Sequence, residues 1–114
     1  MLGSAFAGLG RTNDAIDQFR LALKLRPDYQ NARYNLARAL TKIRHLNEAA
    51  DMFRQVVAAY PHDAQARNGL GEVLLQQGKY SEALVEFDEA LAIDPSLTVA
   101  ESNRELALKN AEAK

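Results

Sequence analysis

The residue types that can carry chemistry are few in this sequence and are scattered along it. The histidines are His45 and His62, and neither has further ligands at a spacing that would hold a metal ion. The four serines are Ser4, Ser81, Ser96 and Ser102. No motif places a base beside any of them, and a serine needs such a base to act as a nucleophile. The sequence therefore predicts no metal site and no serine-based catalysis.

Two other patterns suggest a site but lie in the wrong context. Gly69 and Gly71 fall inside a helical apolar pattern and precede Glu72, whereas a glycine loop that binds a dinucleotide follows a strand. Acids gather between Glu82 and Asp94. Catalytic carboxylates need a buried cleft, and an exposed helix face explains these acids more simply. We expect no catalytic residue and no cofactor, so the chain is predicted not to be an enzyme.

The composition excludes further classes of function. The chain has 114 residues, is 47% hydrophobic and 25% charged, and carries a net charge of -1, which is ordinary for one folded domain. It has no cysteine, so disulfides and thiolate chemistry are excluded. No apolar run is long enough for a membrane helix, and no basic field invites nucleic acid. No targeting signal is present, so the expected location is cytoplasmic.

The prolines show how the chain is built. Pro27, Pro61 and Pro95 follow one another at intervals of 34 residues. Other columns repeat at the same offset, namely Ala15, Ala49 and Ala83; Phe19, Phe53 and Phe87; and Leu2, Leu36 and Leu70. This many matched columns indicates an internal repeat.

Each repeat carries the apolar spacing of two helices. In residues 30–63, apolar residues recur at steps of three and four in two stripes, with the polar stretch 44–47 between them. Before the second stripe of each repeat stands one of three good N-cap residues, Asn13, Asn47 and Ser81. Each second helix ends before its proline. Every unit is therefore predicted to be a helical hairpin, with the repeated phenylalanine packed between its two helices.

These residues resemble the tetratricopeptide repeat (TPR) family, whose 34-residue unit carries Leu-Gly, then Ala, a bulky aromatic and Pro at fixed positions. The match is closest in residues 64–97, through Leu70-Gly71, Ala83, Phe87 and Pro95. The family's tryptophan is absent, and Arg33 and Arg67 stand in its place; Arg44 replaces the glycine that usually closes the first helix.

The resemblance implies an all-α fold, a right-handed α-solenoid of helix-turn-helix hairpins. The predicted units are residues 1–29, whose first helix is truncated, 30–63 and 64–97. Residues 98–114 break the repeat pattern but keep one apolar stripe, which predicts a C-terminal capping helix with a polar outer face.

The resemblance also implies that the first helices line a concave groove that holds a peptide or a partner's helix. In this groove Tyr34 and Leu75 would give apolar contact, while Arg38 and Lys42 would pair with carboxylates. The predicted groove residues are Asn31, Tyr34, Asn35, Arg38, Thr41, Lys42, Gln65, Asn68, Glu72, Leu75 and Gln76. The same arc continues in the cap through Val99, Ser102, Asn103, Leu106 and Lys109.

One specialised groove of the family is not expected here. Repeats that clamp a partner's C-terminal carboxylate use a lysine with several asparagines and arginines at matching columns. Asn35 fits one of these columns, but Gly69 and Asn103 stand at the corresponding positions of the next units. The basic partners are absent, so binding of a chaperone tail in that manner is not predicted.

The predicted function is a non-catalytic protein–protein interaction scaffold, with no nucleic acid or membrane partner. Two alternatives stay open, a regulatory or substrate-recruiting segment of a larger enzyme and a self-assembling structural repeat protein. Residues 30–63 carry a net charge of +2 and residues 64–97 a net charge of -4, which would orient a partner of split charge or a second copy. The first unit begins partway through its first helix and has no charge before Arg11, which predicts a weak or swapped homodimer through the N-terminal hairpin.

Overall fold

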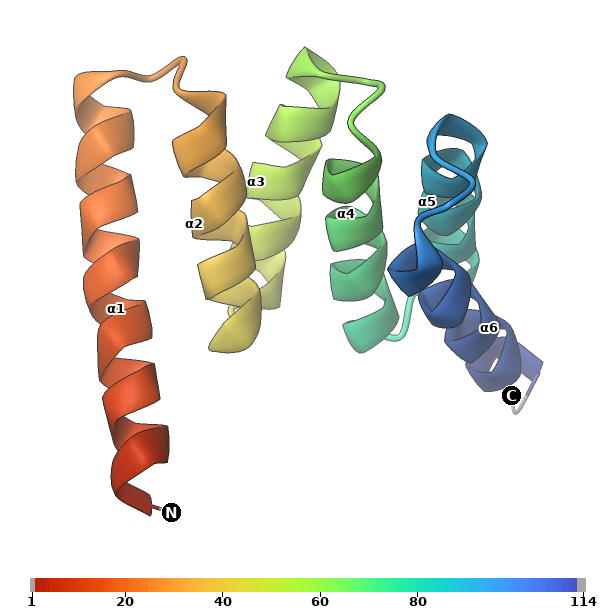
Figure 1. Cartoon of the computed structure of the whole chain (residues 1–114), viewed down its shortest axis with the longest axis horizontal. Helices are drawn as coiled ribbons and strands as arrows, with labels where there is room; N and C mark the ends of the chain where they lie inside the picture. Colours follow the sequence, from red (N-terminus) through yellow and green to blue (C-terminus); the bar gives the residue numbers. More distant parts are fainter. Residues whose placement is uncertain (1, 113–114) are drawn as a thin grey trace.

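The structure, a computed structural model, describes residues 2–112 and the side chains of residues 11–112. The described part consists of six helices with no strand: α1 (Leu2–Leu25), α2 (Gln30–Lys42), α3 (Leu46–Ala59), α4 (Ala64–Gln76), α5 (Tyr80–Ile93) and α6 (Thr98–Glu112). They stand side by side in chain order, with α1 at one end of the row and α6 at the other (Figure 1). The predicted all-α helical repeat solenoid is confirmed.

Two helical hairpins with the same turn form the centre of the molecule, α2–α3 and α4–α5. The backbone at Arg44 has φ 63° and that at Gly78 has φ 80°, so both lie in the left-handed region. The N–H of His45 donates to Leu40 O at 2.9 Å, and the N–H of Lys79 donates to Leu74 O at 2.8 Å. These bonds close both first helices in the Schellman manner. The repeat therefore keeps its turn although Arg44 replaces a glycine.

The core lies between the first helices of the hairpins, α2 and α4, and the second helices, α3 and α5. It is formed by the residues of the repeated columns. Phe53 and Phe87 are 2% and 0% exposed, and Ala49 and Ala83 are fully buried beside them. A Cβ atom at Gly71 would lie 2.5 Å from Cε1 of Phe87, which is closer than real side chains approach. The Phe87 ring can therefore pack against α4 only because Gly71 has no side chain.

The first unit differs from the predicted hairpin, because α1 runs without interruption from Leu2 to Leu25. The turn expected between residues 10 and 13 is wrong for this structure, and Figure 1 shows α1 reaching past the neighbouring end of α2. A continuous helix satisfies the N–H groups of residues 11–14 internally, whereas a turn would leave two helix ends to be capped.

The predicted burial of Phe19 is also corrected by this continuous helix. Phe19 is half-buried and packs against the core from its edge, and Ala15 is half-buried too. Neither is covered by a helix from its own unit. Ile16, at 5% exposed, is the residue of α1 that enters the core.

The predicted N-caps Asn47 and Ser81 are wrong by two residues. The N-cap positions of α3 and α5 are His45 and Lys79, and neither makes a side-chain capping bond. Asn47 therefore lies in the first turn of α3, and Ser81 lies in the first turn of α5. The left-handed residue leaves one position before the next helix begins, so the turn geometry sets the start. A side-chain cap exists at α4, where Asp63 accepts from the N–H of Ala66 at 3.1 Å.

The C-terminal helix α6 behaves as the sequence predicts for a cap. Ala100 and Ala107 are fully buried against the last hairpin, while Glu101 and Glu105 are exposed. Its one apolar side faces α4 and α5. Among the described residues, no helix is both long and apolar enough to cross a membrane.

Candidate functional site

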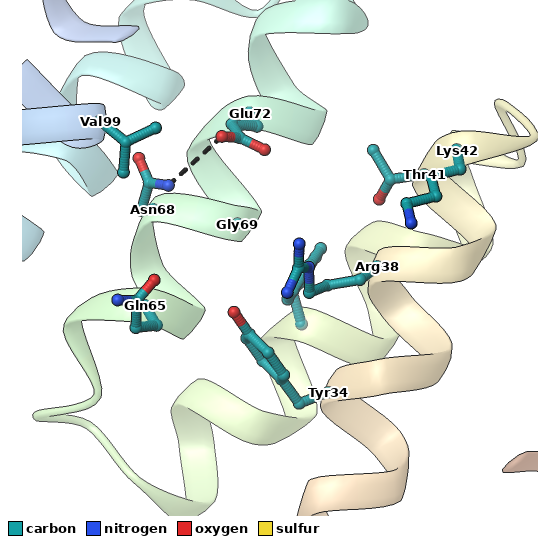
Figure 2. Close-up of a pocket in the computed structure, with 10 residues that line it drawn as sticks. Tyr34, Arg38, Thr41, Lys42, Gln65, Asn68, Gly69, Glu72 and Val99 are labelled. Atoms are coloured by element: carbon teal, nitrogen blue, oxygen red, sulfur yellow. Dashed lines mark hydrogen bonds between the residues drawn. The ribbon is translucent and has the colours of Figure 1, made fainter. Parts of the chain in front are cut away.

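A groove of about 240 Å³ runs between α2 and α4 and ends at the first turn of α6. Figure 2 shows Tyr34, Arg38, Thr41 and Lys42 projecting from α2 on one side, and Asn68 and Glu72 from α4 on the other. The Phe53 ring of α3 lies at the bottom of this groove beneath Gly69, whose lack of a side chain lets the α4 backbone pack directly on the ring. We call this the α2–α4 groove.

The α2 wall of this groove is held by aromatic packing. The Tyr34 ring meets Phe53 edge to face, with centroids 5.8 Å apart and planes at 73°. The guanidinium carbon of Arg38 lies 6.0 Å from the Tyr34 ring centroid. Burial raises the pKa of Tyr34, and the nearby Arg38 only partly offsets that rise. At neutral pH Tyr34 is therefore a neutral hydroxyl, able to donate to a ligand.

The same wall carries two cations, Arg38 and Lys42, that form no ion pair in the described part of the chain. The ion pairs found in the described part of the chain join Arg20 to Glu48, Arg54 to Asp51, Arg67 to Glu86 and Arg104 to Asp88. None of them includes Arg38 or Lys42, and both of these side chains are exposed. Two unpaired cations beside an aromatic floor can bind a carboxylate and an adjacent apolar side chain.

The α4 wall carries an anion in a fixed position. Oε1 of Glu72 accepts from Nδ2 of Asn103 at 2.9 Å and from Nδ2 of Asn68 at 3.3 Å. Nδ2 of Asn103 also donates to Oδ1 of Asn68 at 3.2 Å. Asn68 is 5% exposed, so this network is part of the packing between α4 and α6. It orients Glu72 into the groove opposite the two cations.

The structure brings together seven of the residues that the sequence assigned to the groove: Tyr34, Arg38, Thr41, Lys42, Gln65, Asn68 and Glu72. Val99, assigned to the cap's arc, joins them. Phe53 was assigned to the core alone, and its second role as the groove floor was missed. The signal that could have shown it is Gly69, where the other repeats have larger residues.

The other predicted groove residues lie elsewhere. Asn31 is exposed, and Leu75 packs partly buried against the core. Gln76 accepts from Nη1 of Arg44 at 3.2 Å, which links two successive turns. Asn35 lines a separate hollow. In the cap, Val99, Ser102, Leu106 and Lys109 of the predicted arc are exposed, and Val99 lines the α2–α4 groove.

This second hollow, of about 430 Å³, lies between α1 and α2 and is called here the α1–α2 hollow. Its lining consists of Arg11, Thr12, Ala15, Phe19, Asn35, Arg38, Ala39 and Lys42. It shares Arg38 and Lys42 with the α2–α4 groove. In the part of the chain that the structure describes, no cluster of three or more His, Cys, Asp or Glu residues could hold a metal ion.

Comparison with protein families agrees with this architecture. A family profile described as "Tetratricopeptide repeat" matches residues 42–97, and a second, described as "TPR repeat", matches residues 3–43. The chain belongs to the TPR family.

Solved TPR structures superpose closely on this chain. MamA has a TM-score of 0.85 at 25% identity, and the match covers 97% of this chain and 61% of MamA. YrrB, titled a TPR protein with an unusual peptide-binding site, has a TM-score of 0.80 at 25% identity over 92% of this chain and 54% of its own. The first TPR of Spaghetti (RPAP3), bound to the HSP90 peptide SRMEEVD, has a TM-score of 0.86 at 20% identity over 98% and 88%. This chain thus spans under two thirds of MamA and YrrB. No protein with a curated description matched the sequence.

The position of the family's tryptophan has a different use in this TPR chain. Nη2 of Arg33 donates to the carbonyl of Pro27 at 2.7 Å, and Nε of Arg67 donates to the carbonyl of Pro61 at 2.8 Å. Both arginines therefore bond to the turn that enters their own helix. Sequence reasoning noted the replacement but did not find this role, because it depends on the path of the turn.

Proposed function

We propose that this TPR chain is a non-catalytic interaction module that holds an acidic, partly apolar peptide segment of a partner protein in the α2–α4 groove. The observation that carries the proposal is the pairing of two cations that form no ion pair in the described part of the chain, Arg38 and Lys42, with the Tyr34 ring beside them. A carboxylate of the peptide would bond to Arg38, and its neighbouring apolar side chain would rest on the partly exposed ring of Tyr34.

The opposite wall adds direction to the binding. One oxygen of Glu72 is held by Asn68 and Asn103, and the carboxylate faces the groove. A donor on the peptide, such as a main-chain N–H or a lysine, would meet it. A peptide with an acid on one edge and a donor on the other would therefore bind in one orientation.

The relatives support peptide binding as the function. The RPAP3 domain is titled as bound to a peptide, and YrrB as having a peptide-binding site. The alternative, a recruiting segment of a larger enzyme, would use the same groove. It is favoured by no contact in the structure.

The test is a selection from a random heptapeptide display library on the immobilised chain, followed by fluorescence anisotropy of the selected peptides. We expect enrichment of Asp or Glu beside an apolar residue. Arg38→Ala should weaken binding of a selected peptide about tenfold or more, because a charge-assisted bond contributes about 1.5–3 kcal/mol. Tyr34→Ala should weaken it too, with a modest loss of stability from the lost ring contact.

Arg54→Ala is the matched control, because Arg54 is an exposed arginine of α3 outside the groove. The peptide SRMEEVD is a second probe. We expect this chain to bind it weakly, because tight binding would require the carboxylate clamp that the sequence lacks. A library that yields no enriched peptide, or affinity unchanged in Arg38→Ala, would contradict the proposed site.

A further inference from the structure

The α1–α2 hollow lies where a helix is missing from the repeat pattern. Its floor includes Ala15 and Phe19, both half-buried. The residues of the same columns in the next repeats, Ala49 and Phe53, are 0% and 2% exposed. In those repeats the first helix of the hairpin covers these columns. The first unit shows the same surface with that helix absent.

The chain carries a segment with the pattern of the missing helix. Leu2, Gly3 and Phe6 align at the repeat offset with Leu36, Ala37 and Leu40, which are 3%, 0% and 0% exposed in α2. The segment has no charged residue before Arg11, so its apolar residues suit the apolar part of the hollow, which is formed by Ala15, Phe19 and Ala39. Its sequence therefore matches the covering that the hollow lacks.

In the observed helix this segment cannot reach the hollow of its own chain. Residues 2–10 continue the axis of α1 away from Phe19, and the rise of the helix from Ala5 to Ala15 is about 15 Å. Gly10 lies in the column of Arg44 and Gly78, the two left-handed turn residues. The same position is thus helical in the first unit and a turn in the other two.

We propose that residues 2–10 of one copy seat in the α1–α2 hollow of a second copy, and that the second copy returns the contact, giving an exchanged dimer. The seated segment covers Ala15 and Phe19 as α2 covers Ala49 and Phe53. Residues 10–13 act as the hinge, continuous in the dimer. The hollow shares Arg38 and Lys42 with the α2–α4 groove, so the seated segment would lie beside the two cations that the proposed peptide uses.

The first test is sedimentation equilibrium of the chain from micromolar to millimolar concentration. We expect a monomer–dimer equilibrium. Leu2→Glu with Phe6→Glu, which puts charge on the segment, and Ala15→Glu, which puts charge in the seat, should each weaken the dimer at least tenfold. Leu21→Glu is the matched control, because Leu21 is 51% exposed on α1 and does not line the hollow.

Gly10→Ala sharpens this test in the opposite direction. Alanine favours a continuous helix over glycine by about fivefold per chain and disfavours the left-handed turn. We therefore expect a tighter dimer in this variant. A weaker dimer would place the hinge in a turn and overturn the exchange.

Pulsed EPR separates exchange from folding back within one chain. The protein has no cysteine, so Ala5→Cys with Asn35→Cys can carry two spin labels without background. The doubly labelled chain is measured diluted into excess unlabelled chain, and the two singly labelled chains are measured mixed. Exchange predicts a long distance in the first sample and a short one in the second.

A short distance in the diluted sample, a monomer at all concentrations, or a dimer that survives both charge variants would overturn the proposal.

Discussion

The first and third repeats have the same column residues but differ in what those residues meet. In the third repeat, α4 and α5 close on each other, and Phe87 is 0% exposed. In the first repeat, one helix replaces the hairpin, and Phe19 stays at the edge of the core. The repeat columns therefore specify which residues pack together when two helices meet, but they do not decide whether the helices meet.

Packing of the repeat columns competes with the local hydrogen bonding of a continuous helix. Continuing a helix through residues 11–14 gains one backbone bond per residue, whereas folding back gains the burial of a short helix against Ala15 and Phe19. In the second and third repeats the first helix also packs against a preceding unit, which adds burial. The described chain offers no preceding unit to residues 2–10.

The largest expected effect is on the phenylalanine column. Phe53→Ala should cost about 3–5 kcal/mol of the free energy of unfolding, because the ring is fully enclosed. Phe19→Ala should cost about half of that or less, since its ring is already partly in contact with solvent. Urea unfolding at micromolar protein measures both. Equal losses would mean that the first unit is as closed as the others.

Smaller effects are expected in the glycine column, where substitution of Gly78 and substitution of Gly10 should change the stability in opposite directions. Gly78 has φ 80°, so Gly78→Ala should destabilise the chain by about 1–2 kcal/mol from backbone strain alone, since nothing lies within 4 Å of the added methyl group. Gly10 is helical, so Gly10→Ala should stabilise by about 1 kcal/mol. Thermal melts of the two variants test this. Destabilisation by Gly10→Ala would show that the first turn forms in solution.

The same comparison explains how far the sequence could predict the molecule. The proline, alanine and phenylalanine columns predicted the hairpins α2–α3 and α4–α5 and their core, but not the continuous α1. Helical spacing predicted Tyr34, Arg38 and Glu72 on one face. The bonds of Asn103 to Glu72 and Asn68 were not predicted, because they join residues of successive units whose register follows from packing. The left-handed φ of Arg44 was not predicted for a similar reason, because the residues around Arg44 impose the turn.

The second and third repeats differ in how they treat their buried arginine. In the second, Nε of Arg33 is buried without a hydrogen-bond partner, and the residue in the column of Glu86 is Met52. In the third, Nη1 of Arg67 meets Oε1 of Glu86 at 3.2 Å, and both side chains are largely buried. The added ion pair places a carboxylate in a poorly solvated site.

The smallest expected effect concerns the Arg67–Glu86 ion pair, and the question is whether it stabilises or destabilises the folded chain. Burial raises the pKa of Glu86, and Arg67 only partly counters the rise. The native state therefore holds the proton more tightly than the unfolded chain, and stability is lost as the pH rises through the native pKa. Glu86→Gln, which keeps the neutral form, should melt slightly above the parent chain at pH 7, and the difference should vanish below about pH 4. Glu82→Gln, exposed on the same helix, is the control. A Gln variant that melts below the parent chain at pH 7 would show that Coulomb attraction to Arg67 outweighs the cost of burial.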